Sequence, residues 1–404
     1  MKNITISNLF IMVCLAGCSG TKADADHTMI VEPPSAMTPA VSLSMNGYTV
    51  LPEWIENEGI RAGFMSSTTG DLSKIPRYVE AVKTMGLNTA IVYGCSFAET
   101  PNHLKYYREW IRLCNQAGLH VFAFYPWQPP VGNSCRPVIF TDGTEGLFPC
   151  PLDNQLWQKY LEADIAGKLA HESIDGIFLD MEMYRTEKEP ESRRQYSFET
   201  CFCDSCFSRY ILNRTQIQPL PIVGKGQRKS WLRQNGFLSD YTAYQIEQVE
   251  SKTEQLKNKV HAVNPKLMFG VYPALHETNW VRTAVMRALS RKSYPVISFS
   301  TDTFGYYDSP WGAERIPSDL TTYFEKNSIN GIYVAGYLLR RYTSAEIGIQ
   351  ITQSLKRSQG YWLFRIPQLV DDSVPEFEKL AGGTRGDYLK AIREANAALK
   401  KKPK

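Results

Sequence analysis

Short apolar runs alternate with longer amphipathic stretches along most of this chain. The short runs are rich in β-branched residues, which is typical of buried strands, and the stretches between them repeat apolar residues with a period near 3.6, which predicts helices. We expect strands at 60–66, 88–93, 119–125, 174–182, 266–272, 295–300, 331–336 and 360–366. We expect helices near 73–86, 101–117, 154–172, 239–263, 279–291, 313–328, 344–358 and 375–399.

Strict alternation of strand and helix predicts an α/β fold, and eight successive units favour a closed (β/α)₈ TIM barrel over an open sheet. An open sheet of this kind usually carries a Gly-rich phosphate turn after its first strand, and the sequence shows none. Long insertions follow the third strand (126–152) and the fourth strand (183–238). Because both leave from the carboxyl ends of strands, we expect both to overhang the same mouth. Residues 51–404 are predicted to form this one domain.

The fourth predicted strand ends in two acids. Residues 175–182 read Asp-Gly-Ile-Phe-Leu-Asp-Met-Glu, and side chains two apart on a strand point the same way, so Asp180 and Glu182 share a face. Chemistry in parallel barrels lies at the carboxyl ends of strands, and two close carboxylates favour keeping one proton between them. Such a pair suits general acid catalysis, although strand-end acids also occur in purely structural ion pairs. Asp175 has the opposite parity and is expected to cap the start of the strand.

The pattern Asp-Gly-Ile-x-x-Asp-x-Glu resembles the fourth-strand signature of family 18 glycoside hydrolases, the chitinases and related endo-β-N-acetylglucosaminidases. Phe178 stands where that signature has its middle Asp. The resemblance implies a retaining hydrolase in which Glu182 is the general acid/base. It also implies that Asp180 orients the acetamido group of an N-acetylhexosamine, whose carbonyl oxygen attacks the anomeric carbon.

Other strand ends offer further candidates for binding sugar. Asp302-Thr-Phe-Gly, after the sixth strand, is similar to a family 18 segment whose Asp contacts the acetamido group, with Thr301 in place of that segment's Tyr. Trp362 matches an eighth-strand Trp that forms the floor of the sugar subsite, and it could equally be a core aromatic. The remaining candidates for substrate binding lie near strand ends: Tyr93, Trp127, Tyr184, Tyr272, His276, Glu277, Tyr337 and Arg340.

The seventh strand ends in Leu338, Leu339, Arg340 and Arg341, without an acid. Barrel glycosidases with a nucleophile of their own commonly place one there, so its absence favours either substrate assistance or a carboxylate from another strand, such as Asp302 or Glu277. The two arginines could bind an acidic sugar or simply pair with loop acids. A non-catalytic glycan-binding protein is the alternative from a different class.

Five of the nine cysteines lie in the two insertions. Cys201, Cys203 and Cys206 are closely spaced, and similar clusters occur in uncharacterised barrel proteins assigned as glycosidases. Such thiolates can hold a structural zinc ion if Cys135, Cys150 or His103 supplies a fourth ligand, and disulfides are the alternative. Neither arrangement would take part in catalysis, for which no cofactor is expected.

Residues 1–18 combine an early Lys, a short apolar core and Leu-Ala-Gly-Cys, and they resemble a bacterial lipoprotein signal in which Cys18 receives the lipid. Residues 19–50 are rich in Ser, Thr, Ala and Pro and predict a flexible tether. We therefore expect an extracytoplasmic protein of the cell envelope, anchored to the membrane by lipid. Lys+Arg minus Asp+Glu is 45 − 41 = +4, which gives no electrostatic case for binding nucleic acid. The expected partner is a glycan.

Overall fold

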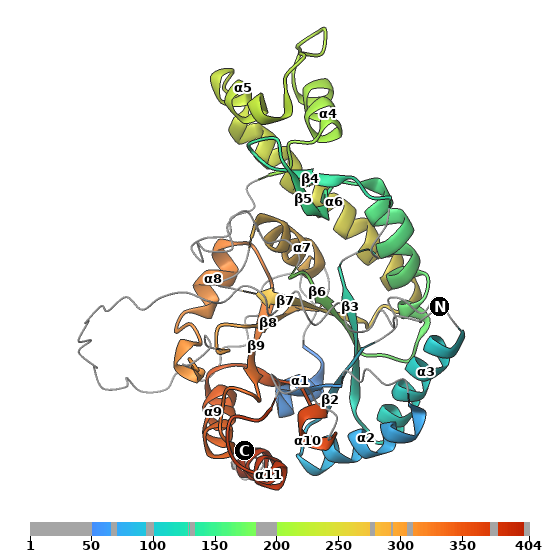
Figure 1. The fold of residues 1–404 in the computed structure, drawn as a ribbon, viewed down its shortest axis with the longest axis vertical. Coiled ribbons are helices and arrows are strands. Elements are labelled where there is room, and N and C mark those ends of the chain that lie inside the picture. The colour runs from blue at the N-terminus through green and yellow to red at the C-terminus, as the bar shows by residue number, and fades with distance from the viewer. Residues whose placement is uncertain are drawn as a thin grey trace, which may run out of the picture.

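Eight parallel strands close into a barrel in the computed structural model (Figure 1). The structure describes residues 51–65, 71–93, 101–127, 129, 134–182, 200–274, 279–291, 294–304, 310–371 and 379–399. In chain order the barrel strands are β1 (Ile60–Phe64), β2 (Thr89–Tyr93), β3 (His120–Pro126), β6 (Gly176–Asp180), β7 (Met268–Ala274), β8 (Val296–Ser300), β9 (Gly331–Leu338) and β10 (Gly360–Phe364). Each pairs in parallel with its neighbours, and β10 pairs with β1. The predicted (β/α)₈ barrel is confirmed.

Helices surround the barrel. They are α2 (Ile75–Thr84), α3 (Pro101–Gln116), the π-helix η3 (Leu156–Ala166), α6 (Leu238–Val263), α7 (Trp280–Ser290), α8 (Leu320–Lys326), α9 (Ser344–Arg357), α10 (Pro367–Val370) and α11 (Arg385–Leu399). The short helix α1 (Glu53–Glu58) packs instead against the interior of the barrel through Ile55. The helix expected near 313–328 starts late, at Leu320. Pro317 disfavours helical backbone at the residue before it, and the Asp319 side chain caps the new start by accepting the Thr322 N–H at 2.8 Å.

Aromatic rings fill the interior of the barrel. Along each strand alternate residues point inward, and the inner cluster includes Phe122, Phe178, Phe299 and Trp362. Glycines on neighbouring strands leave room for these rings. A Cβ at Gly176 would lie 2.3 Å from the Phe122 ring, and one at Gly270 would lie 2.2 Å from the Phe299 ring. The interior is therefore a packed core, and chemistry is confined to its open end.

The two insertions form a lobe beside the barrel. The hairpin β4 (Pro137–Ile139) and β5 (Glu145–Pro149) follows β3, and α4 (Asp204–Arg214) and α5 (Arg228–Gln234) follow β6. Figure 1 shows these elements gathered around the outer end of α6, lateral to the barrel. Their described parts therefore do not cross the barrel opening in this view, contrary to our expectation. The 26 residues of α6 explain the reach, because a helix of that length spans about 39 Å.

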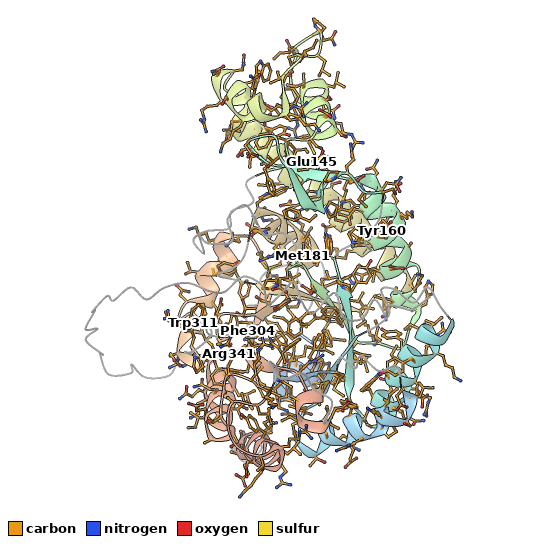
Figure 2. All side chains as sticks on the ribbon, viewed as in Figure 1. Glu145, Tyr160, Met181, Phe304, Trp311 and Arg341 are labelled. Carbon is orange, nitrogen blue, oxygen red and sulfur yellow. The ribbon has the colours of Figure 1, made fainter. Side chains whose placement is uncertain are left out.

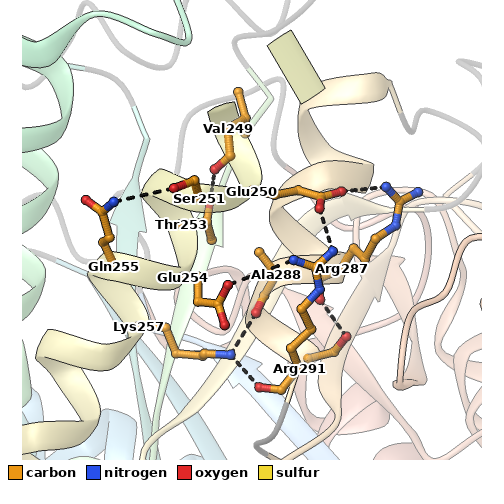
Figure 3. Close-up of polar contacts among 11 residues, drawn as sticks. Val249, Glu250, Ser251, Thr253, Glu254, Gln255, Lys257, Arg287, Ala288 and Arg291 are labelled. Carbon is orange, nitrogen blue, oxygen red and sulfur yellow. Dashed lines mark hydrogen bonds and ion pairs between the residues drawn. The ribbon is translucent and has the colours of Figure 1, made fainter. Parts of the chain in front are cut away.

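A charged network fixes α6 against α7 (Figure 3). Glu250 is buried on α6 and accepts hydrogen bonds of 2.5 Å from both Arg287 and Arg291. Lys257 donates to the carbonyl of Ala288 at 2.8 Å and so satisfies the end of α7. These charges are all paired within the network, and we assign them a structural role.

The amino-terminal predictions lie outside the described residues. They comprise the signal at 1–18 with Cys18 and the tether at 19–50. Among the helices that the structure describes, none has the length and apolar character needed to cross a membrane.

Candidate active site

Asp180 and Glu182 stand where the fourth barrel strand opens at the mouth. Asp180 is the last residue of β6 and has the same parity as Phe178, whose ring lies inside the barrel. Glu182 follows in a turn two residues later, and both acids are partly exposed. The Asp180 carboxylate accepts the main-chain N–H of Glu182 at 3.0 Å. The structure thus places Asp180 and the main chain of Glu182 at the carboxyl end of the barrel, linked by this hydrogen bond.

The peptide that carries these acids is held on both sides by neighbouring strands. The carbonyl of Asp180 accepts the N–H of Trp127, just after β3, at 2.8 Å. The N–H of Met181 donates to the carbonyl of Tyr272 in β7 at 2.7 Å. Figure 2 labels Met181 beside β6. Extending the main-chain ladder past the formal strand end fixes the direction of the acid side chains.

Asp175 lies at the opposite end of this strand and makes only structural contacts. Its carboxylate accepts the N–H of Val121 at 2.8 Å and lies 3.1 Å from Nδ1 of His120. The His120 ring is stacked on Trp54 with centroids 3.7 Å apart. The prediction that Asp175 caps the strand is confirmed.

Aromatic rings lie at the upper layer of the barrel. Tyr272 and Phe304 are partly exposed and lie with ring centroids 5.4 Å from Trp362. Trp362 is 1% exposed, and its indole N–H donates to the carbonyl of Ser300 at 3.2 Å. It is therefore a core aromatic that supports Tyr272 and Phe304, and the assignment of Trp362 as the exposed floor of a sugar subsite is wrong. Phe304, labelled in Figure 2, was predicted only as part of its sequence motif.

Two other predicted aromatics face the helices. Trp127 is 1% exposed and packs edge-on against Trp157 of η3, with ring centroids 5.5 Å apart. Tyr337 is fully buried, and its hydroxyl lies 2.5 Å from Oγ of Ser354 in α9. Tyr337 belongs to the alternate residues of β9 whose side chains point outward, so its ring packs against the helices although the residue lies near the strand end. Both assignments to substrate binding are corrected.

Asp302 is also turned away from the mouth. It is 1% exposed and accepts a hydrogen bond of 3.2 Å from the hydroxyl of Tyr333, which belongs to the outer cluster. Burial raises the pKa of Tyr333 well above its usual value, and the adjacent Asp302 carboxylate adds to that rise. The parity of β8 explains the placement, since Ser298 and Ser300 face outward and Asp302 follows them. We therefore withdraw Asp302 as an acetamido contact and as a second carboxylate.

Thr301 is a candidate that the sequence alone did not identify. It has the inward parity of Ile297 and Phe299 and follows the last residue of β8. Its hydroxyl is buried and has no hydrogen-bond partner among the residues described. A buried orphan hydroxyl at the mouth is a group that a ligand can satisfy. The sequence signal that could have identified Thr301 is its spacing of two residues from Phe299, whose side chain points into the barrel.

The remaining predicted residues are placed only in part. Tyr93 is the last residue of β2, and Arg340 is partly exposed in the turn after β9. Tyr184, His276 and Glu277 lie outside the described residues. β9 is the seventh barrel strand, and its end carries no carboxylate in the described segment 331–341.

Four cysteines from both insertions converge in the lobe. Cys150, after β5, joins Cys201, Cys203 and Cys206, and the four buried sulfurs lie within 4.8 Å of one another. Cys150 Sγ lies 3.3 Å from Cys206 Sγ and 3.8 Å from Cys203 Sγ, longer than the S–S bond of a disulfide at about 2.05 Å. Of the proposed fourth ligands the structure selects Cys150. Cys135 stays outside the cluster, and the side chain of His103 is not described.

Neighbouring sulfurs shift the pKa of three of these thiols. Hydrogen bonds from Cys150, Cys201 and Cys206 lower the pKa of Cys203. Hydrogen bonds with neighbouring sulfurs, first Cys201 for Cys150 and first Cys150 for Cys206, raise the pKa of those two thiols well above the usual value.

Comparison with known proteins identifies the fold but no sequence family. No protein-family model matches the chain, and no curated protein does. Among solved structures, the β-amylase catalytic domain of Paenibacillus polymyxa is 13% identical with a TM-score of 0.53, covering 86% of this chain and 99% of that one. The β-galactosidases of Bacillus circulans sp. alkalophilus (13%, TM-score 0.53) and Marinomonas ef1 (9%, TM-score 0.54) cover 85% and 84% of this chain.

The match extends over 56% and 60% of those two β-galactosidase chains, so this chain spans little more than half their length. By name, one of the three similar structures is a β-amylase and the other two are β-galactosidases. At such low identity the likeness shows the fold alone. The chain has the (β/α)₈ architecture on which these glycosidases are built, with a pair of acids at the end of its fourth barrel strand.

Proposed function

We propose that this protein is a glycoside hydrolase whose acid/base is Glu182. The observation that carries the proposal is the position of Asp180 and Glu182 at the carboxyl end of the fourth barrel strand, where the Asp180 carboxylate accepts the N–H of Glu182. Barrel enzymes place their chemistry at this end, and glycosidic bonds break when a carboxylic acid protonates the leaving oxygen. The partly exposed rings of Tyr272 and Phe304 supply apolar faces suited to a sugar ring.

The chemistry assigns different roles to the two acids. Glu182 donates its proton to the glycosidic oxygen and later takes a proton from the water that completes hydrolysis. Asp180 orients Glu182, because its carboxylate accepts the N–H of that residue. On an N-acetylhexosamine, Asp180 would also orient the acetamido group, whose carbonyl oxygen bonds to the anomeric carbon as the leaving group departs. Water then opens that cyclic intermediate, so configuration is retained.

Substrate assistance is favoured because two positions considered for a second carboxylate do not supply one at the mouth. The seventh strand ends without an acid, and Asp302 is buried against Tyr333. The alternative is a barrel glycosidase that acts on a sugar without an acetamide and uses Glu277 as its second carboxylate. The β-galactosidases among the similar structures, which act on sugars of that kind, support this alternative.

Replacing Glu182 tests the activity itself. We expect Glu182→Gln to lower kcat/KM on an alkyl N-acetylglucosaminide by about 10²–10⁴-fold, the usual contribution of general acid–base catalysis. Asp175→Ala, at the other end of the strand, is the control and should keep kcat. Full activity of Glu182→Gln would contradict the proposal. Binding to a glycan array with no turnover by the wild type would instead support a glycan-binding protein.

A thiazoline analogue of N-acetylglucosamine distinguishes substrate assistance from a mechanism that uses Glu277 as the second carboxylate. The thiazoline mimics the cyclic intermediate of substrate assistance, and transition-state mimics bind more tightly than substrates. Tight competitive inhibition supports an N-acetylhexosamine substrate. Indifference to the thiazoline, together with turnover of an aryl galactoside, supports the reading with Glu277.

We also propose that Cys150, Cys201, Cys203 and Cys206 hold a structural zinc ion. A tetrahedral ion with Zn–S bonds of about 2.3 Å sets its sulfurs ~3.8 Å apart, close to the spacing seen here. Four thiolates leave no open position for water, so the ion would join the two insertions without entering catalysis.

Metal analysis tests this site. The purified chain should contain about one zinc ion, as a four-thiolate site requires. Cys206→Ser should lose zinc and unfold at a lower temperature. Cys114→Ser, which alters a buried thiol outside the cluster, is the matched control and should keep the metal. A metal-free wild type with disulfides among these cysteines would contradict the assignment.

We propose further that the protein is anchored in the cell envelope by a lipid on Cys18. The support is the sequence pattern of residues 1–18 alone. Cys18→Ser should abolish incorporation of labelled fatty acid and release the protein from the membrane fraction. Unchanged membrane association would contradict the anchor.

A further inference from the structure

Arg282 is a buried cation placed directly behind the pair of acids. It lies in the first turn of α7, is 1% exposed, and its Nε donates to the carbonyl of Met181 at 3.1 Å. Met181 is the residue between Asp180 and Glu182 and is itself fully buried. The guanidinium therefore reaches the peptide that carries both candidate catalytic side chains.

Arg282 brings a cation to the first turn of α7. The first turn of a helix bears partial positive charge, so a cation there is destabilising unless negative charge compensates it. Arg282 is nevertheless held at this point by Asn279, whose side chain caps α7 by accepting the N–H of Arg282 at 3.1 Å. The cap fixes the base of the arginine, and the strand end fixes its tip.

Arg282 completes the hydrogen bonding of the peptide from Asp180 to Glu182. The carbonyl of Asp180 accepts from Trp127, and the N–H of Met181 donates to Tyr272. The N–H of Glu182 donates to the Asp180 carboxylate, which leaves the carbonyl of Met181 for Arg282. Each main-chain polar group across these two peptide bonds thus has a partner from a different source. The first two come from the main chain of neighbouring strands and their ends, and a mutation of Arg282 removes one partner while leaving both candidate acids in place.

We propose that Arg282 is a positioning residue for the acids at the mouth, acting through the carbonyl of Met181. The inference rests on the proposed function of Glu182. Without the guanidinium, the Met181 carbonyl loses its partner, and the peptide between Met181 and Glu182 keeps only the hydrogen bond from the Glu182 N–H to the Asp180 carboxylate. Glu182 would then sample directions away from the glycosidic oxygen. A small misplacement of a catalytic group lowers the rate while leaving substrate binding largely intact.

Comparison of two arginines on the same helix tests the inference. Arg287 lies further along α7 and binds Glu250 and the carbonyl of Asn327, remote from the strand end. Arg282→Met and Arg287→Met each remove a guanidinium from α7, so both should lose stability. We expect only Arg282→Met to lower kcat, by about 10²-fold with KM little changed. Arg282→Lys, which can still donate to the carbonyl, should recover part of kcat.

Hydrogen exchange provides a readout that needs no turnover. The amides of Met181 and Glu182 should exchange at least about tenfold faster in Arg282→Met than in the wild type, and at the wild-type rate in Arg287→Met. Unchanged exchange at these amides overturns the inference, whether or not the protein is active. Faster exchange with unchanged kcat in an active enzyme overturns it as well. If the wild type has no turnover and Glu182→Gln changes nothing, the proposed function fails, and exchange still decides whether Arg282 anchors this peptide.

Discussion

Asp175 and Asp180 flank the same strand and meet different surroundings. At the closed end, the Asp175 carboxylate binds the N–H of Val121 and lies against His120, so its oxygens are occupied by neighbouring elements. At the open end, the Asp180 carboxylate accepts the N–H of Glu182, and the partly exposed ring of Tyr272 lies on the neighbouring strand. The strand delivers acids at both ends, but only the open end gathers groups that a substrate can reach.

The contrast shows how strand direction separates structure from chemistry. In a parallel barrel every strand begins at one end and finishes at the other, so acids at the starting end can satisfy the main chain of adjacent strands. Acids at the carboxyl ends of the strands lie beside the loops that follow, where side chains are available for binding and catalysis. The same residue type in one sequence motif is therefore structural at one end of the strand and, in our proposal, functional at the other.

Of the substitutions that test the difference between Asp175 and Asp180, one at Asp180 should have the largest effect on activity. Asp180→Asn keeps an oxygen that can accept the N–H of Glu182 but removes the charge. We expect kcat/KM to fall by about 10²-fold with little change in melting temperature, since the charge acts on the reaction. Wild-type kinetics in Asp180→Asn would reduce Asp180 to the structural role that Asp175 has.

A substitution at Asp175 should lower the stability of the fold and leave the activity unchanged. Asp175→Ala removes the acceptor for the N–H of Val121, which we expect to cost about 1 kcal/mol of unfolding free energy. Urea denaturation measures that loss, and kcat of the folded protein should match the wild type. A fall in kcat without a fall in stability would contradict the division between the two ends.

A substitution at Thr301 should have the smallest effect, and we expect it to change KM alone. Thr301→Val replaces a buried hydroxyl without a described partner by a methyl group of similar size, so stability should be unchanged or rise by up to ~1 kcal/mol. If the hydroxyl binds sugar, KM should increase. An unchanged KM would remove Thr301 from the site and leave the acids as its main polar groups.

The alternation of apolar runs was sufficient to predict the barrel, because each strand is buried on both faces and each helix presents one apolar stripe. All eight strand positions and the pair of acids followed from it. The identity of the fourth sulfur did not, because Cys150 and the other three lie in separate insertions that meet only in the folded lobe.

Strand parity beyond the strand ends explains the errors in the site. Trp127, Tyr337 and Asp302 lie close to the mouth in sequence, but their side chains follow the outward face toward the helices. Trp362 follows the inward face and is covered by the rings above it. Arg282 escaped notice because it comes from a helix, and nothing in its own segment links it to Met181.

Leaving-group dependence tests the role of Glu182 most directly. A general acid matters most when the departing oxygen is strongly basic, because an activated aryl oxide leaves without a proton. Glu182→Ala should keep a kcat/KM near that of the wild type on a dinitrophenyl glycoside and lose most of its kcat/KM on a glycoside with an alkyl leaving group. An equal loss on both substrates, or no loss on either, would contradict the assignment of Glu182 as the proton donor.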